Sequence, residues 1–386
     1  ADALKEALRR PAWRPSRRLF LAATAASAAA LATGGFVGWT WWDRRDKIRT
    51  EFVLPWNDAT LVAASVDEQI DRPSTYIELG RGRAMTAWLR RGRYRLALLR
   101  GGTVVGEQVR AIEPDDPRIE IRRPDEAMRA HLLDRMVRRP ATPSATESIP
   151  GAYNGSRGAG RPVPAFWIDR HALSNAEYLA FVRATGQAAP EFWGPPEGWD
   201  ARMNSGWAAL PATGMVWEAM EAFARWAGVR LPLSSEWSIA VEAHKEYPWS
   251  PAKHDPREVA NVGRDVGKNA FLSGHDHENH RRAYEAGVLT VDDLPAGFLD
   301  RTRDGMLHPL GNISEMTDTP ATTVLDEGPP ELIGGTRISR GSPWGLPAND
   351  YSPLHKVMWN FRGQRAISVG FRCAVSEPEA VLSRIV

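Results

Sequence analysis

Hydrophobic side chains recur at every second position in part of the N-terminal half of this chain. Tyr94, Leu96 and Leu98 follow this period of two, which is typical of a half-buried β-strand. Two consecutive glycines shortly afterwards predict a hairpin turn into a second strand. The pattern predicts a small β-sandwich-like domain over residues 50–123, suited to a spacer or docking role.

Further along the chain, hydrophobic residues recur every three or four positions, which is the spacing of one face of a helix. Ser174 and Glu177 have the spacing of a capping box, so a helix is expected to begin there and to end at Gly186. A second helix is expected over residues 217–226, with apolar side chains on one face and a stop at Gly228. Core packing is the simplest role for both helices.

An uncharged segment near the N-terminus predicts a membrane anchor. No charged residue occurs from Leu19 to Trp42, which is long enough to cross a bilayer as one helix. Basic residues dominate positions 1–18, and tryptophans gather at the other end of the segment. The positive-inside rule places residues 1–18 in the cytoplasm. We therefore expect a single-pass protein of the bacterial inner membrane whose later domains are periplasmic or extracellular.

The export route is left open by the residues that precede this anchor. Arg17 and Arg18 match a twin-arginine signal, and the weakly hydrophobic stretch that follows suits that pathway. A general signal anchor with two adjacent arginines is the alternative. In either case the segment is expected to remain uncleaved.

Composition removes several classes of function. The net charge of +2 gives no reason to expect nucleic acid as a partner. A single cysteine, Cys373, excludes an internal disulfide framework and a multi-cysteine zinc site. A polar helix followed by a Pro/Ser/Thr-rich stretch predicts a linker over residues 124–146.

Five separated motifs in the second half of the chain occur in the order found in one protein family. They are Ile149-Pro150-Gly151 with Phe166-Trp167-Ile168-Asp169, Arg230-Leu231-Pro232 with Glu236-Trp237, Ala260-Asn261-Val262, Gly311-Asn312-Ile313-Ser314-Glu315, and Arg340-Gly341-Ser342-Pro343-Trp344 with Gly370-Phe371-Arg372-Cys373. The chain thereby resembles the formylglycine-generating enzyme (sulfatase-modifying factor) family. This resemblance implies an α+β, C-type-lectin-like fold over residues 147–386.

The resemblance argues against the best-known activity of that family. Members that make formylglycine use two cysteines to bind copper and oxidise a substrate thiol. Leu346 and Tyr351 stand at the approximate positions of that pair, and Cys373 has no second thiol to join it. Formylglycine synthesis and copper are therefore not expected.

The resemblance also implies two calcium sites with oxygen ligands. Asn261 and Val262 match the first site, with Asn269 or Asp276 as the downstream partner. The positions that match the second site are His308, Gly311, Ile313 and Glu315. His308 departs from the oxygen ligands that calcium prefers. The alternative for both groups is hydrogen bonding within loops.

A dense cluster of histidine and acidic residues at 275–280 could ligate zinc or copper. It lies in residues 263–285, which resemble an insertion relative to the family. A hydrophilic insertion loop is the favoured interpretation of the cluster.

The segment that lines the substrate cleft of catalytic relatives is the expected partner-binding surface. Aromatic and arginine side chains commonly anchor protein interfaces. The expected contact residues are Tyr351, His355, Trp359, Arg362 and Arg365. Trp344 belongs to the same segment but is expected in the core.

Three functions stay open at this point. The favoured one is a membrane-anchored, exported, non-catalytic binding or scaffolding subunit that holds a partner protein or ligand in a membrane-associated complex. The second is a periplasmic, cysteine-independent oxidase or maturation enzyme of the same fold, with Glu218 or Glu315 as the base. The third is the extracellular sensor portion of a signalling protein.

Overall fold

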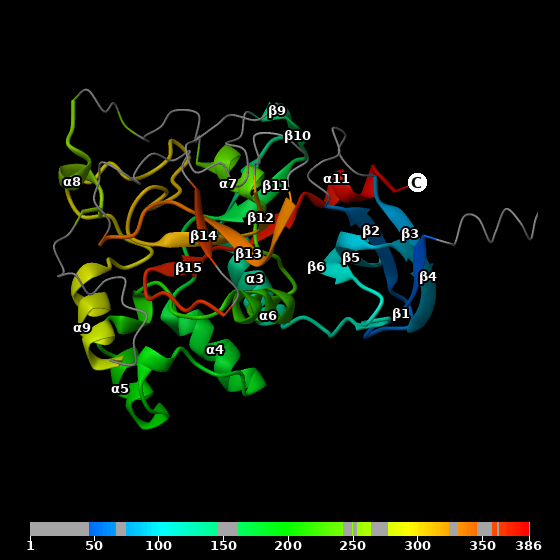
Figure 1. Ribbon diagram of the computed structural model, residues 1–386, viewed down its shortest axis with the longest axis horizontal. Coiled ribbons are helices and arrows are strands. Elements are labelled where there is room, and N and C mark those ends of the chain that lie inside the picture. Colours follow the sequence, from blue (N-terminus) through cyan, green and yellow to red (C-terminus); the bar gives the residue numbers. More distant parts are fainter. Residues whose placement is uncertain are drawn as a thin grey trace, which may run out of the picture.

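The computed structural model of the protein contains a β-sandwich and a larger mixed α/β part that lie side by side (Figure 1). It describes residues 46–66, 75–145, 161–241, 249, 253–263, 277–323, 331–345, 357–360 and 363–385. The predicted anchor at 19–42 lies outside these residues. Among the helices that the structure describes, none has the length and apolar character needed to cross a membrane.

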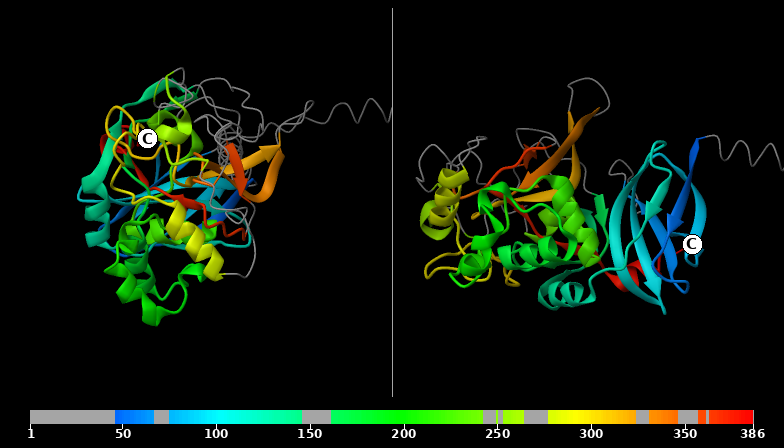
Figure 2. Two further views of the ribbon diagram at one scale, coloured as in Figure 1. Left: turned by 90° about the vertical axis from the view of Figure 1, so that its left-hand side faces the viewer. Right: turned by 90° about the horizontal axis from the view of Figure 1, so that it is seen from below.

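The sandwich is made of two facing sheets, which Figure 2 shows from the side. One sheet has the order β4-β1-β7 and the other β3-β2-β5-β6. The strands are β1 (Lys47–Val53), β2 (Thr60–Ser65), β3 (Ile77–Arg81), β4 (Ala84–Arg90), β5 (Gly92–Arg100), β6 (Thr103–Ile112) and β7 (Arg118–Glu120). The predicted hairpin is present, because Gly101 and Gly102 take positive φ between β5 and β6. Phe52, Leu61 and Leu96 are buried between the sheets.

The α/β part begins immediately after the sandwich and holds most of the helices. The α-helices are α3 (Glu126–Arg135), α4 (Asn175–Thr185), α5 (Trp199–Met203), α6 (Trp217–Ala227), α7 (Ser234–Ala240), α8 (Pro256–Val259), α9 (His277–Gly287) and α11 (Pro378–Leu382). Short 3-10 helices are η1 (Glu191–Trp193), η2 (Pro196–Gly198) and η3 (Trp207–Ala209).

Small sheets complete the α/β part, in the orders β16-β11-β8, β10-β9 and β14-β13-β12-β15. Their strands are β8 (Met136–Arg139), β9 (Thr142–Ala145), β10 (Arg161–Val163), β11 (Phe166–Asp169), β12 (Ser314–Thr323), β13 (Glu331–Arg340), β14 (Val357–Asn360), β15 (Val369–Phe371) and β16 (Ala374–Ser376). The mixture of short helices and small sheets is the α+β architecture expected from the sequence.

The two helices predicted from hydrophobic spacing are confirmed. Ser174 and Glu177 form the capping box of α4, and Gly186 ends that helix in the left-handed conformation. Gly228 ends α6 in the same way. Both helices pack in one aromatic core, in which the Phe223 ring lies edge-on to those of Phe181 and Phe371.

Helix α9 differs from the expected insertion loop. Residues 277–287 are helical, and Tyr284 is fully buried against Phe192 and Trp344. Its hydroxyl donates to the carbonyl oxygen of Pro211 and accepts from the amide of Asn175. A single buried aromatic residue among polar neighbours gives little periodic signal, so the sequence did not reveal this core contact.

The segment expected as a linker also differs from its prediction. After α3, residues 136–139 form β8, which pairs with β11 of the α/β part. Residues 142–145 form β9, which pairs with β10. Their short polar sequences give no alternation, because partner strands rather than local pattern define them.

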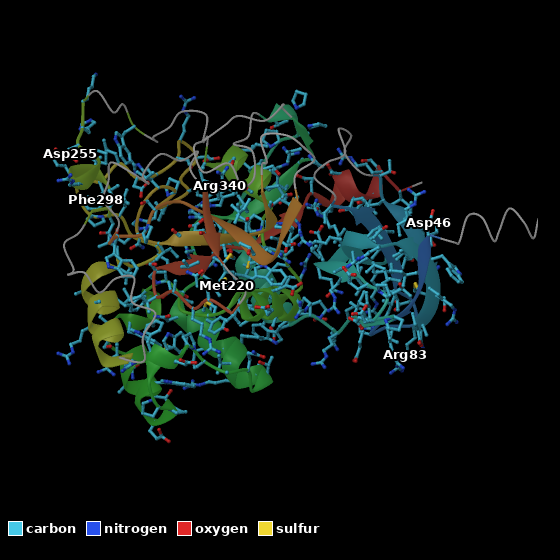
Figure 3. The ribbon with its side chains drawn as sticks, in the orientation of Figure 1. Asp46, Arg83, Met220, Asp255, Phe298 and Arg340 are labelled. Carbon is cyan, nitrogen blue, oxygen red and sulfur yellow. The ribbon has the colours of Figure 1, made fainter. Side chains whose placement is uncertain are left out.

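The C-terminus returns to the sandwich. Val381 of α11 is buried with Tyr76, Val62 and Ala97, and a β-bridge joins Tyr76 to Ile385. Figure 3 shows side chains filling the junction, with Asp46 and Arg83 at the sandwich end and Asp255 and Phe298 at the opposite end. The two parts are therefore connected both by the chain and by a shared core.

Candidate functional site

The predicted partner-binding segment is only partly described. Tyr351, His355 and Arg362 lie outside the described residues, and Trp359 is described only by its backbone in β14. Arg365 is exposed and forms an ion pair with Glu191. The structure therefore provides one accessible guanidinium of the predicted set.

Trp344, at the start of this segment, is a core residue as expected. Its side chain is fully buried, and its ring contacts Tyr284 edge-on. A Cβ atom added to Gly287 would lie 2.0 Å from its indole nitrogen. Only glycine fits at that position, so α9 and Trp344 are packed tightly against each other.

Cys373 is buried inside the same domain. Its side chain has no exposed surface, and its backbone N–H donates to Asp169 at 2.9 Å. Burial, with the nearby Asp169 carboxylate, raises the pKa of the Cys373 thiol well above its ordinary value. A thiol that stays protonated and has no access to solvent is a poor nucleophile and metal ligand. Its position between β15 and β16 is structural.

Glu315 is held in a buried ion pair. Trp237 Nε1 and Arg372 Nε both donate to its Oε2 atom at 2.6 Å, and Arg372 Nη2 donates to Oε1. The side chains of Glu315 and Arg372 are almost completely buried. A divalent cation on this carboxylate would lie beside the guanidinium, which opposes calcium binding there. The same contacts leave Glu315 poorly placed to act as a catalytic base.

Asn261 is buried in a loop network. Its Nδ2 atom lies 2.8 Å from the Gly287 carbonyl oxygen and 2.9 Å from Asn312 Oδ1. A Cβ at Gly311 would approach the Asn261 backbone to 3.0 Å, so the two loops meet closely. Val262 is fully buried next to it. These contacts match the loop-bonding alternative, and calcium at Asn261 stays a prediction.

His308 belongs to the same loops and adopts a positive φ of 53°. Its Nε2 atom lies 2.9 Å from the Asp293 carbonyl oxygen, and burial lowers its pKa to about 4. Asp300 accepts the N–H groups of Leu310 and Gly311, and burial raises its pKa to about 7. In the part of the chain that the structure describes, no three histidine, cysteine or acidic side chains form a group able to hold a metal ion.

Metal binding by the 275–280 cluster stays a prediction. Residues 275 and 276 lie outside the described residues, and 277–280 are described only as the backbone of α9. Glu218, the other predicted base, is half-buried in the first turn of α6.

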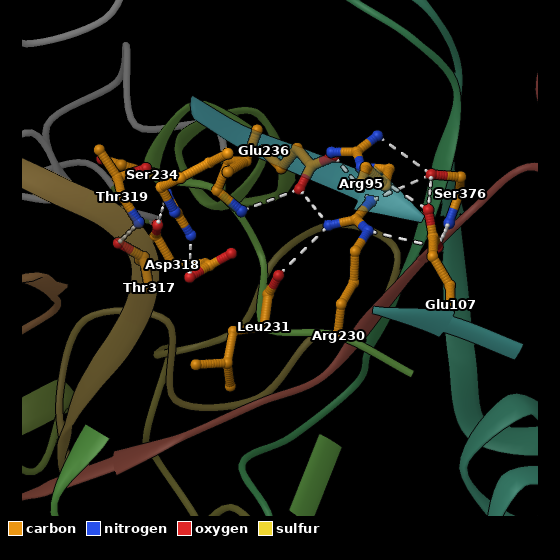
Figure 4. Close-up of polar contacts among 12 residues, drawn as sticks. Arg95, Glu107, Arg230, Leu231, Ser234, Glu236, Thr317, Asp318, Thr319 and Ser376 are labelled. Carbon is orange, nitrogen blue, oxygen red and sulfur yellow. Dashed lines mark hydrogen bonds and ion pairs between the residues drawn. The ribbon is translucent and has the colours of Figure 1, made fainter. Parts of the chain in front are cut away.

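The sequence did not reveal a buried charge network at the junction of the two parts (Figure 4). Arg95 Nη2 lies 3.0 Å from Glu236 Oε1, and Arg230 donates to both oxygens of Glu236 at 2.6 and 2.8 Å. Glu107 accepts from the N–H and hydroxyl of Ser376, each at 2.7 Å, and lies 3.3 Å from Arg230. All five side chains are buried, so this network fixes the sandwich against the α/β part.

The carboxylates of this network are held in the charged form. Burial alone would raise the pKa of Glu236, but Arg230 and Arg95 outweigh it and hold that pKa at about 2. Glu107 has a lowered pKa for the same reason. Within the described residues, Arg95 Nε and Arg230 Nε form no hydrogen bond, but they lie 3.6 and 3.3 Å from oxygens of Glu107. Two buried arginines thus face two buried carboxylates, which is the arrangement of a structural network.

Comparison with known proteins assigns residues 151–377 to the sulfatase-modifying factor enzyme 1-like domain. The chain is 32% identical over 260 residues to a formylglycine-generating enzyme of Streptomyces coelicolor, covering 54% of this chain and 77% of that protein. It is 26% identical over 241 residues to the hercynine oxygenase of Mycolicibacterium smegmatis, covering 55% of this chain and 53% of the relative. Against the serine/threonine-protein kinase Pkn1 of Chlamydia trachomatis, it is 24% identical over 226 residues, covering 55% of this chain and 33% of the kinase.

The chain thus spans about half the length of the hercynine oxygenase and a third of the kinase. Among solved structures, PvdO from Pseudomonas aeruginosa matches with a TM-score of 0.44 and 18% identity, covering 63% of this chain and 94% of PvdO. The matched domain occupies more than half of the chain and coincides with the α/β part that contains Cys373 and the Glu315–Arg372 pair. The chain belongs to the sulfatase-modifying factor family.

Proposed function

We propose that this protein is a membrane-anchored, exported binding or scaffolding subunit, and that its sulfatase-modifying-factor-like domain holds a partner protein instead of oxidising a thiol. The observation that carries the proposal is that the chain has a single cysteine, Cys373, and that this cysteine is buried. Copper-dependent thiol oxidation in the family needs a pair of reactive cysteines, whereas Cys373 is single and buried. The proposed binding surface is the segment 344–365, of which Arg365 is exposed.

A thiol-oxidation assay tests the catalytic half of this proposal. The purified protein is incubated with copper, oxygen and a sulfatase-type cysteine peptide, and aldehyde is measured by mass spectrometry. We expect no aldehyde above a control without protein. A Cys373→Ala variant should give the same result, so aldehyde that depends on Cys373 would overturn the proposal.

The membrane location is a separate part of the proposal. It depends on the uncharged segment at 19–42 and on the basic residues before it. Protease added to intact spheroplasts should digest the domains after residue 43 and spare residues 1–18. Protection of the whole chain would place the domains in the cytoplasm.

A cysteine-independent oxidase or maturation enzyme is the second candidate function. Relatives that match the same domain are named as enzymes, including a hercynine oxygenase. The Arg372 contact argues against Glu315 as the base of such an enzyme and leaves Glu218, which is half-buried on α6. If this function is correct, Glu218→Gln should abolish turnover of a substrate that the wild-type protein converts, without lowering the melting temperature.

A further inference from the structure

A groove of about 540 Å³ lies where the edge of the sandwich meets the α/β part. Its walls are formed by β6, by residues 118–124 and by the facing sides of α4 and α6. Figure 1 shows β6 and α6 close together at this junction. The volume is within the range of ligand-binding pockets. It is remote in sequence from the proposed surface at 344–365.

Gln108 places an unused hydrogen-bond donor in this groove. The side chain is only 7% exposed, and its Nε2 atom has no hydrogen-bond partner in the part of the chain that the structure describes. Gln108 pairs with Leu96 across β5 and β6, so both face the interior of the sandwich. A buried amide without a partner destabilises the protein, and an acceptor supplied by a ligand would satisfy it.

Arginines line the same groove as this amide. They include Arg110 on β6 and Arg225 on α6. Burial lowers the pKa of Arg110, and the nearby positive charge of Arg225 lowers it further. Their acidic partners are Asp116, at 3.7 Å from Arg110, and Glu221, at 2.6 Å from Arg225. Two guanidiniums in one desolvated groove favour a bound anion.

The outer wall adds further positive charge. Arg118 and Arg122 are exposed and form no ion pair with any residue that the structure describes, and Glu120 lies between them in sequence. The groove is lined by five arginines and three acidic residues. Arg110, Arg225 and Arg123 pair with Asp116, Glu221 and Glu126, and Glu107 belongs to the buried network, which leaves Arg118 and Arg122 against Glu120. The balance of charge therefore favours a negatively charged ligand.

We propose that this groove binds an extended, acidic segment of a partner protein, with a carboxylate between Arg110 and Arg225 and an acceptor oxygen on Gln108. An extended peptide is favoured over a small anion because β6 is the edge strand of its sheet. The Glu107 N–H and the Val104 carbonyl oxygen on this edge already bond to Gly228 and Arg129, so a further strand would pair with the part of β6 beyond Gln108. Leu98 and Trp226 line the same groove and can contact an apolar side chain of that segment. The site does not depend on whether the sulfatase-modifying-factor-like domain is catalytic.

The test uses a fluorescein-labelled peptide of about ten residues in which glutamate and valine alternate, a pattern that suits an edge strand. Binding to the full chain in detergent is measured by fluorescence anisotropy. Replacing Arg118 and Arg122 by alanine should weaken binding about tenfold, equivalent to about 1.4 kcal/mol. Arg81 and Arg83 are exposed arginines on the far side of the sandwich, and their double alanine variant is the charge-matched control.

A second variant separates binding from folding. Gln108→Met keeps the side-chain size and removes the unused donor, so the protein should be at least as stable while the peptide binds about threefold more weakly. The proposal is overturned by unchanged affinity in both groove variants, by equal loss in the Arg81/Arg83 control, or by equal binding of a lysine–valine peptide. Binding of vesicles containing an anionic lipid, or of inorganic phosphate, in place of the peptide would also overturn it.

Discussion

Neighbouring residues on β6 face two different environments at the junction of the sandwich and the α/β part. Glu107 points into the buried charge network, where it contacts Arg230 and Ser376, and Arg230 in turn bonds to Glu236. Gln108 points to the opposite face, where its amide nitrogen has no partner in the described structure. One strand thus separates a region in which buried charges are matched from one in which donors are in excess. The first region joins the two parts, and the second is the face on which we propose that an acidic segment binds.

The largest expected effect on stability comes from removing one carboxylate from the buried charge network of Arg95, Glu107, Arg230 and Glu236. Glu236→Ala would leave Arg95 and Arg230 buried without their carboxylate, and we expect a loss of about 3–5 kcal/mol in the free energy of unfolding. Urea denaturation measures this loss. The control is Glu113→Ala, which removes the exposed partner of Arg91 and should cost less than about 1 kcal/mol. Equal effects of the two substitutions would mean that the network does not join the parts.

Acid should destabilise the protein through two buried carboxylates, Glu236 in this network and Glu177 in the capping box of α4. The folded-state pKa values of Glu236 and Glu177 are about 2, below the value near 4.3 expected in the unfolded chain. Their contribution is therefore complete above about pH 4.5 and is lost as the pH falls towards 2, by roughly 2–3 kcal/mol per group. The pKa of Asp300 is raised and that of His308 is lowered. Their titration changes the free energy of unfolding mainly above pH 4.5, outside the range in which Glu236 and Glu177 titrate.

Urea titrations between pH 2 and 5 measure this dependence. In Glu236→Gln the slope of unfolding free energy against pH should be shallower, because one of the carboxylates whose pKa is lowered by folding is absent. An unchanged slope would show that Glu236 does not titrate with folding.

Structural features that depend on residues close together in the sequence could be predicted from it. Features that depend on residues far apart in the sequence could not. The capping box of Ser174 and Glu177 and the glycine turn after β5 use neighbouring residues, so their patterns identified them. The buried charge network joins Arg95 to Glu236 and Glu107 to Ser376, which are far apart in the chain and carry no shared motif. The groove depends on the same long-range packing. Family motifs located Glu315, but its role changed once Arg372 was found against it.

A smaller effect on stability is expected at Gln108, on the opposite face of β6. Gln108→Met should raise the free energy of unfolding by up to about 1 kcal/mol, because it removes an unsatisfied buried amide and keeps the apolar contacts. The measurement is the urea midpoint at neutral pH, compared with Gln108→Ala, which also removes the packing. Destabilisation by Gln108→Met similar to that of Gln108→Ala would indicate that the amide has a structural partner.

The smallest effect on stability is expected at the rim of the groove. Arg118 and Arg122 are exposed, so the double alanine variant should unfold within about 0.5 kcal/mol of the wild type. Thermal and urea unfolding test this directly. A large loss of stability would place these arginines in the joint and remove the contrast between the two faces.

We propose that the protein acts by holding a partner and not by oxidising a thiol. The most direct test of this claim is purification of the intact chain from membranes in mild detergent, followed by light scattering on the isolated complex. We expect a defined complex that survives Cys373→Ala and is lost in a Tyr351→Ala/Arg362→Ala variant with an unchanged melting temperature, while the Arg81/Arg83 double alanine variant retains it. A chain that elutes without any partner, or a complex unaffected by the Tyr351/Arg362 substitutions, would contradict the claim.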